Sequence, residues 1–256
     1  MTVNLSFLPS LAAAFVLMFA RLGSMVMLMP GFGEQGVPAR IRLAIAVMLT
    51  LVMMPLHMAA YAVDLGGGFG PLAGLLMKEV AVGIVLGLAG RLTITSLQVA
   101  GVVVAQQLGL GFASTVDPSQ NEQGVVVSTF LTMLGVTLIF ATDLHYLVIG
   151  ALEQSYSIFA PGATLPVDDF SRLILMTAAA AFRIGAQIAA PFLVFGLLFN
   201  VGLGVLARLM PQVQIFFLGV PASIMLGFLL LVLILSAVMA VFLNHVGSLL
   251  GDMALR

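Results

Sequence analysis

The chain has 256 residues, of which 62% are hydrophobic and only 7% are charged, and its formal net charge at pH 7 is -1. Ordinary soluble domains carry about 25% charged residues, so this composition excludes a soluble globular protein and predicts a single domain, residues 1–256, of a membrane protein. The charge balance offers no basic surface to nucleic acid. The absence of cysteine excludes disulfides and thiolate metal sites.

Three apolar stretches in the first part of the chain are long enough to span a membrane, which takes about 20 residues. They cover residues 8–29, 41–62 and 72–92. No Lys or Arg precedes the first stretch, so we expect it to be retained rather than cleaved as a signal peptide. Trp is absent, and an aromatic belt at the membrane interface would therefore rest on phenylalanines and on the tyrosines, which are Tyr61, Tyr146 and Tyr156.

The next segment, residues 93–108, is more polar than a helix surrounded by lipid. Thr95, Gln98 and Gln106 fall on one helical face, with Val102 interrupting the stripe. This pattern predicts a helix that faces a polar surface or a subunit interface.

A polar insert with glycines at both ends follows at residues 109–124. Backbone outside a helix is tolerated at membrane depth only where protein or water surrounds it, and loops of this length are often functional. We interpret the insert as a re-entrant loop that plugs a channel, with Phe112 as the apolar surface of the plug; the alternative is an exposed connector. The candidate plug residues are Gly109, Gly111, Phe112, Asp117, Pro118 and Glu122.

Three further apolar stretches, residues 125–152, 173–201 and 215–243, bring the set to about six. Because a spanning segment must satisfy its backbone polar groups internally, we expect an all-α membrane protein with long hydrophobic helices in hairpins. The connections after the first, third and fifth stretches hold Arg40, Arg42, Arg91 and Arg208, whereas those after the second and fourth hold only Arg172. This excess favours both termini lying outside the cytoplasm.

Charges inside the apolar stretches need partners, because a charge at the bilayer centre costs at least about 2.5–3.5 kcal/mol. Lys78 and Glu79 are adjacent and point in different directions around a helix, so each needs a partner elsewhere, as do Arg21 and Arg183. Pairing between subunits and a proton relay are both open, although the carboxylates are scattered singly. Gly83 and Gly87 form a GxxxG pair that allows close approach of another helix, and we expect sister subunits to cover such faces.

No catalytic motif is found, since HExxH, GxSxG, a P-loop and a Rossmann glycine pattern are all absent from the sequence. We therefore expect a protein that is not an enzyme and needs no cofactor and no metal. The competing functional class is a stand-alone secondary transporter or channel, which would use Pro191 and the nearby Arg183 as a broken-helix binding site. No internal repeat at half length supports that class.

Three motifs resemble one family over essentially the whole chain. They are VPAR at residues 37–40, QLGLGFASTVDP at 107–118 and NVGLGVLARLMPQVQIFFLGVP at 200–221. In length, number of stretches and motif order, the chain resembles the FliR family of flagellar type III export-gate proteins, whose injectisome counterparts form the SctT family. One departure is Gln214, where many relatives carry Asn.

The resemblance implies a subunit of a helical, multi-subunit export gate in the bacterial inner membrane, within the flagellar basal body. This structural, pore-forming subunit would build the channel entrance with FliP and FliQ for secretion of unfolded flagellar proteins. FlhB would pack against its outside and FlhA would lie nearby. Residues 1–200 would be FliP-like helices with the plug loop, and residues 201–256 would be a FliQ-like C-terminal hairpin region.

The last of these motifs is expected to form a cytoplasmic turn between the final two helices. Pro211 removes a helix donor and stops the preceding helix, and Arg208 near a helix C-terminus is favoured by the helix dipole. A partner site and a simple hairpin turn are both compatible with this motif. Its candidate residues are Asn200, Gly202, Gly204, Arg208, Pro211, Gln212, Gly219 and Pro221.

Deleting part of the insert at residues 109–124 should make cells leak ions and small molecules when the gate is produced, because the apolar plug surface would be removed from the channel. The measurement is the entry of a small dye into cells that produce the shortened or the intact gate. A shortened gate that stays as tight as the intact one contradicts the plug hypothesis.

Overall fold

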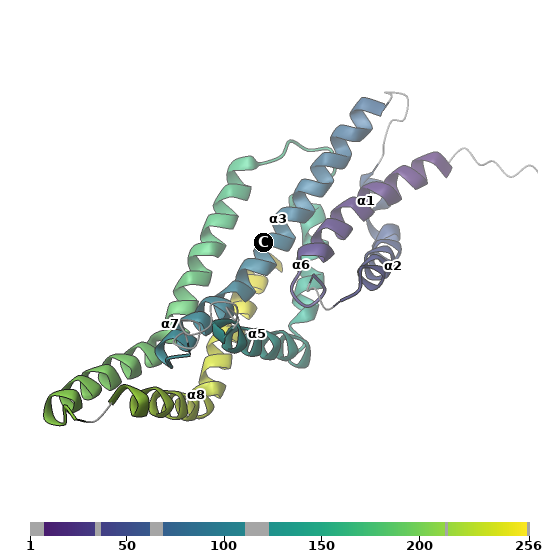
Figure 1. Ribbon diagram of the computed structural model, residues 1–256. Helices are drawn as coiled ribbons and strands as arrows, with labels where there is room; N and C mark the ends of the chain where they lie inside the picture. The colour runs from purple at the N-terminus through teal and green to yellow at the C-terminus, as the bar shows by residue number, and fades with distance from the viewer. Residues whose placement is uncertain (1–7, 34–36, 62–68, 111–122, 213–214, 255–256) are drawn as a thin grey trace, which may run out of the picture. The chain divides into compact units, whose positions relative to one another are not determined.

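The computed structural model describes residues 8–33, 37–61, 69–110, 123–212 and 215–254, and every regular element in these ranges is helical (Figure 1). The elements are α1 (Leu8–Leu28), α2 (Ala39–His57), the 3-10 turn η1 (Met58–Ala60), α3 (Phe69–Gln107), α5 (Gln123–Ala141), α6 (His145–Ile158), α7 (Val167–Leu209) and α8 (Ile215–Ala254). The all-α prediction is therefore confirmed.

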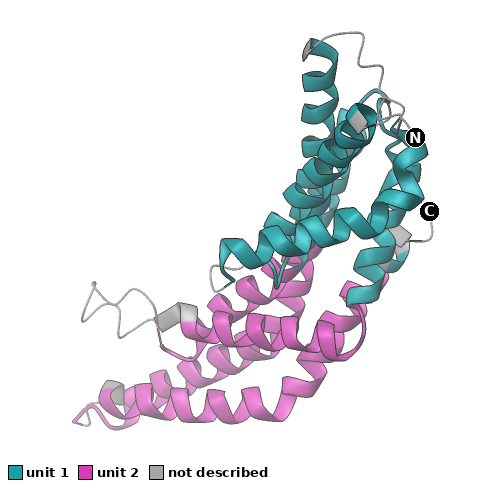
Figure 2. Cartoon of the chain, turned by 90° about the vertical axis from the view of Figure 1, so that its right-hand side faces the viewer, with its two compact units in different colours: residues 1–93, 145–178, 250–256 teal, residues 94–144, 179–249 magenta. Residues whose placement is uncertain are grey.

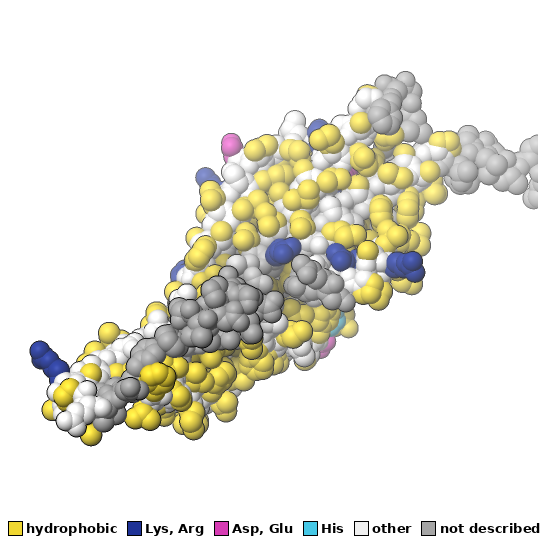
Figure 3. Space-filling model, in the orientation of Figure 1, with side chains coloured by type: hydrophobic (Ala, Val, Ile, Leu, Met, Phe, Trp, Pro, Cys, Tyr) yellow, Lys and Arg dark blue, Asp and Glu magenta, His cyan; other side chains and the backbone are white. Residues whose placement is uncertain are grey.

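The described helices are long and apolar enough for a membrane protein. Five could cross a membrane by length and composition, or six if the broken pair of α5 and α6 counts as one span. Hydrophobic side chains dominate the face drawn in Figure 3, and charged ones are sparse there. This surface suits lipid or other apolar helices, and the prediction of an all-α membrane protein with about six long helices is confirmed.

Two stretches are divided differently from the sequence-based expectation. The segment 93–108 is not a separate helix, because it continues the third stretch as one helix, α3, of 39 residues. Its polar face is present, since Gln98 and Gln106 are both exposed in this helix.

The fourth stretch, expected as one helix over residues 125–152, is broken between α5 and α6. Asp143 lies at the break with a φ of 60°, a left-handed conformation that Asp tolerates better than most residues and that a helix cannot contain. Its amide donates to the Phe140 carbonyl at 3.4 Å rather than to the fourth residue back. Hydropathy alone missed this break because the residues on both sides of it are apolar.

The chain consists of two compact units, coloured separately in Figure 2. Unit 1 comprises residues 1–93, 145–178 and 250–256, and unit 2 comprises residues 94–144 and 179–249. In unit 1, buried side chains of α1, α3 and α6 form an apolar core that includes Leu17, Leu22, Val82, Leu86 and Leu152. In unit 2, the largest fully buried apolar side chains are Leu97, Leu108, Leu131, Phe192 and Phe242.

Gly83 and Gly87 of α3 lie against α1 of the same chain. A Cβ atom at Gly83 would collide with Ser24 and the Arg21 carbonyl, and one at Gly87 would meet both the Leu28 Cβ and the Met25 carbonyl oxygen at 2.8 Å. The close helix approach expected of this pair therefore occurs within unit 1, and it needs no sister subunit.

Replacing Gly87 with Leu should destabilise the chain itself by about 1–3 kcal/mol, because the new side chain has no room against α1. The measurement is the thermal unfolding of the purified chain in detergent. A Cβ atom at Gly74, on the same helix, would meet nothing within 4 Å, so Gly74→Leu is the matched control and should unfold at or above the wild-type temperature. Equal unfolding temperatures for the two variants would contradict the α1–α3 packing.

Candidate functional site

The most deeply buried charges in the described part of unit 1 form an ion pair between α1 and α3. Arg21 is 1% exposed and Glu79 is 2% exposed. The Arg21 Nε donates to Glu79 Oε2 at 2.5 Å, and an Nη atom of Arg21 donates to Glu79 Oε1 at 3.1 Å. This two-point contact matches the planar guanidinium to the carboxylate and is the strong form of such a pair.

Arg21 also binds the C-terminal end of α6. Its terminal nitrogens donate to the carbonyl oxygens of Ser155, at 3.1 Å, and Phe159, at 2.8 Å. Ser155 lies in the last turn of α6 and Phe159 follows its last residue. The end of a helix carries partial negative charge on its carbonyl groups, so a cation is favoured there. A single guanidinium thus connects α1, α3 and α6.

Two tyrosines complete the cluster. The Tyr61 hydroxyl donates to Glu79 Oε2 at 3.0 Å, and burial raises the pKa of the Tyr61 phenol far above its usual value although nearby Arg21 opposes the shift. A raised pKa favours the neutral phenol, which is the form that donates to Glu79. The Arg21 guanidinium carbon lies 4.4 Å from the centre of the Tyr156 ring, a cation–π contact. The imidazole of His57 stacks on that ring at 4.3 Å.

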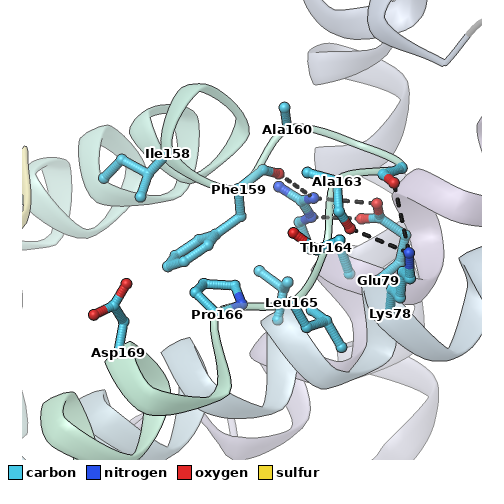
Figure 4. Close-up of a pocket in the computed structure, with 13 residues that line it drawn as sticks. Lys78, Glu79, Ile158, Phe159, Ala160, Ala163, Thr164, Leu165, Pro166 and Asp169 are labelled. Carbon is cyan, nitrogen blue, oxygen red and sulfur yellow. Dashed lines mark hydrogen bonds and ion pairs between the residues drawn. The ribbon is translucent and has the colours of Figure 1, made fainter.

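A pocket of about 270 Å³ lies beside the ion pair (Figure 4). Arg21, Lys78 and Glu79 line it together with residues 158–160 and 162–166, which connect α6 to α7, and with Asp169. The Lys78 Nζ donates to the carbonyl oxygens of Ala163, at 3.2 Å, and Gly162, at 3.5 Å. Gly162 has a φ of 84°, a conformation that favours glycine and turns the connection toward Lys78.

The chemistry of this cluster is that of a structural clamp. The Glu79 carboxylate accepts from both Arg21 and Tyr61, and Arg21 uses four hydrogen bonds. Charges satisfied in this way hold helices together and are poor acids, bases or nucleophiles. Among the described residues no group of His, Asp and Glu is placed to hold a metal ion.

The sequence singled out Lys78 and Glu79, and the structure brings both close to Arg21. It also places Tyr61 and Tyr156 in the same cluster. Tyr61 and Tyr156 are buried beside the ion pair, whereas Tyr146 is 64% exposed. The sequence predicts that Arg21 needs a partner, but it does not predict that this partner is Glu79. The signal for this pair was a single arginine in the first apolar stretch and a single glutamate in the third, each of which needed an opposite charge.

Gly109, the first residue of the predicted plug loop, ends α3. It has a φ of 80°, its amide donates to the Gln106 carbonyl, and the amide of Leu110 donates to the Ala105 carbonyl. This pair of bonds is the Schellman helix end that favours glycine. The Ser223 hydroxyl on α8 donates to the Leu108 carbonyl at 2.9 Å. The other candidate plug residues lie outside the described residues; they are Gly111, Phe112, Asp117, Pro118 and Glu122.

The motif at residues 200–221 forms the end of α7, a turn and the start of α8. Arg208 lies in the last turn of α7, and Pro211 and Gln212 are in the turn. A Cβ atom at Gly219 would lie 2.8 Å from a methyl carbon of Leu203, whereas Gly202 and Gly204 face open space. Asn200 is exposed on α7, and Pro221 lies inside α8 without breaking it.

The sequence is similar to known export proteins over nearly its whole length. It matches the family described as bacterial export proteins, family 1, over residues 12–249. It is 43% identical over 234 residues to the flagellar biosynthetic protein FliR of Caulobacter vibrioides. This match covers 91% of this chain and 93% of that protein. The FliR protein of Bacillus subtilis is 27% identical, and the match covers 90% of this chain and 89% of that protein. The FliR protein of Escherichia coli is 28% identical, and the match covers 86% of this chain and 82% of that protein.

Replacing Glu79 with Leu should destabilise the chain by about 3–5 kcal/mol, because the buried Arg21 would lose its carboxylate. The double variant Arg21→Met, Glu79→Leu should unfold at a higher temperature than Glu79→Leu alone, since it leaves no unpaired buried charge. Thermal unfolding in detergent measures both. The control is Lys78→Met, which removes a half-buried charge and should change stability by at most about 1 kcal/mol. A double variant less stable than Glu79→Leu would contradict the clamp.

Proposed function

Since this chain belongs to the bacterial export proteins of family 1, and within them to the FliR family, we propose that it is a structural, pore-forming subunit of the flagellar export gate. FliR-family membership makes it a membrane component of flagellar type III protein export. In the proposed role it builds the entrance of the export channel in one complex with FliP and FliQ, and it is not an enzyme. The observation that carries the proposal is the match to FliR proteins over about nine-tenths of the chain.

The exposed surface of unit 2 supports assembly with other apolar helices. Large hydrophobic side chains at the end of α7 and the start of α8 are widely exposed, with Leu209 at 72%, Phe217 at 73% and Met225 at 74%. Burial of such surface contributes roughly 25 cal/mol per Å² in water, so outside lipid it needs a protein cover. Gly202 and Gly204 would allow a neighbouring helix to come close.

The clamp in unit 1 supports a rigid structural subunit rather than a moving carrier. Its charges are saturated by partners from α1, α3, α6 and the residue after η1. A carrier would need a charged site that binds and releases its cargo near the middle of the membrane. We propose that the working surface of the subunit comprises the predicted plug loop, Gly109 to Glu122, and the turn motif, Asn200 to Pro221.

The wider setting follows from the same proposal. FlhB would pack on the outside of the complex and FlhA nearby, in the bacterial inner membrane at the flagellar basal body, and unfolded flagellar proteins would pass through the channel. The second candidate, a stand-alone secondary transporter or channel, is favoured by one observation, the broken helix pair of α5 and α6, because transporters often use discontinuous helices.

Coexpression with FliP and FliQ decides between these functions. A gate subunit should copurify with both in one complex of fixed composition, and it should be recovered in higher yield than when it is expressed alone, because binding to the folded form stabilises that form. The measurement is the mass of the purified complex beside the total membrane-inserted chain. A monomer or a homo-oligomer, with equal yields with and without FliP and FliQ, would overturn the gate proposal in favour of the transporter.

A further inference from the structure

Arg183 is the one charged residue of α7 between Arg172 and the last turn of the helix. It lies in unit 2 and is exposed. Residues three, four and seven positions away on a helix share its face. These positions hold Met176, Ala179, Ala180, Ala186, Gln187 and Ala190, of which all but the half-buried Ala180 are exposed. Apart from Met176, this arginine therefore stands among small and amide side chains, in a helix that contains an 18-residue window of mean hydropathy 2.1.

Within the described part of the chain, Arg183 has no hydrogen bond and no carboxylate at ion-pair distance. Arg183 interacts electrostatically with His245 of α8. An imidazole carries no negative charge, so His245 cannot neutralise the guanidinium. The Nε2 atom of His245 is itself buried, and it has no hydrogen-bond partner among the described residues. By contrast, Arg21, Lys78 and Glu79 all find partners inside unit 1.

We propose that this face of α7, defined by Ala179, Arg183, Ala186, Gln187 and Ala190, receives an apolar helix of another subunit that presents one carboxylate to Arg183. The inference rests on the proposed function, because it requires a partner subunit. A carboxylate would accept two parallel hydrogen bonds from the guanidinium, and the Gln187 amide offers a further donor. The alanines allow the partner backbone to come near enough for that contact.

The composition of α7 favours a helix over a lipid headgroup as the occupant. Elsewhere on α7, both before and after this face, exposed positions carry large side chains, among them Leu175, Phe182, Leu193, Leu197 and Leu198. Large aliphatic side chains suit either lipid or an apolar protein surface, whereas small residues are enriched where helix backbones approach closely in membranes. The three exposed alanines around Arg183 therefore leave room for a helix backbone that the large side chains elsewhere on α7 do not leave.

The test is coexpression of Arg183→Leu and Arg183→Lys with FliP and FliQ, scored as the fraction of membrane-inserted chain found in the complex. Arg183→Leu should lower this fraction about tenfold or more, because the partner carboxylate would be left buried and unpaired, while insertion is unchanged or improved. Arg183→Lys keeps the charge and should retain more complex than Arg183→Leu. The matched control is Arg172→Leu, an exposed arginine nearer the start of α7, which should assemble like the wild type.

Charge reversal identifies the partner group. Assembly lost in Arg183→Glu should return when one Asp or Glu of a FliP or FliQ helix is replaced with Lys, and a photo-crosslinker at Ala186 should join the two helices. Normal assembly of Arg183→Leu overturns the inference and leaves the proposed function standing. Capture of phospholipid alone at Ala186, or rescue by an acidic residue of this same chain, also overturns it. A wild-type chain that fails to assemble overturns the proposed function and this inference together.

Discussion

A buried guanidinium–carboxylate pair determines how unit 1 is put together. Removing Arg21 and Glu79 from water carries a desolvation penalty of several kcal/mol per ion, and only complete pairing offsets it. The pair is satisfied by the Tyr61 hydroxyl and by the carbonyl groups at the end of α6. Because a bidentate contact tolerates little displacement, α1, α3 and α6 have one mutual arrangement in which no charge is left unpaired. The apolar packing of the core around the pair has no such directional requirement.

The sequence predicted the existence of the helices better than their ends. The first stretch, residues 8–29, matches α1 (Leu8–Leu28), but α7 begins at Val167 rather than at residue 173. Hydropathy predicts that Asp168 and Asp169 lie in a connection between helices. Carboxylates in the first turn of a helix, however, stabilise it by interacting with the helix dipole. The break at Asp143 was missed because hydropathy does not report backbone conformation, and the residues around Asp143 are apolar.

The clamp was only partly predictable. The need of Glu79 for a partner follows from its place in an apolar stretch, and so does the same need at Arg21. The rotation and register of α1 against α3, which decide that these two charges meet, depend on how Gly83 and Gly87 admit α1. Such a fit between two helix surfaces cannot be obtained from periodicity, because many rotations bury an equally apolar face.

Arg21 is separated from its partners by a long stretch of chain, which has a consequence for biosynthesis. Glu79 comes 58 residues after Arg21, and the carbonyls of Ser155 and Phe159 follow 134 and 138 residues after it. When α1 leaves the ribosome, its arginine has no counter-ion, and a lone arginine enters a bilayer poorly. We therefore expect α1 to reach its final position only when α3, which carries Glu79, is also present.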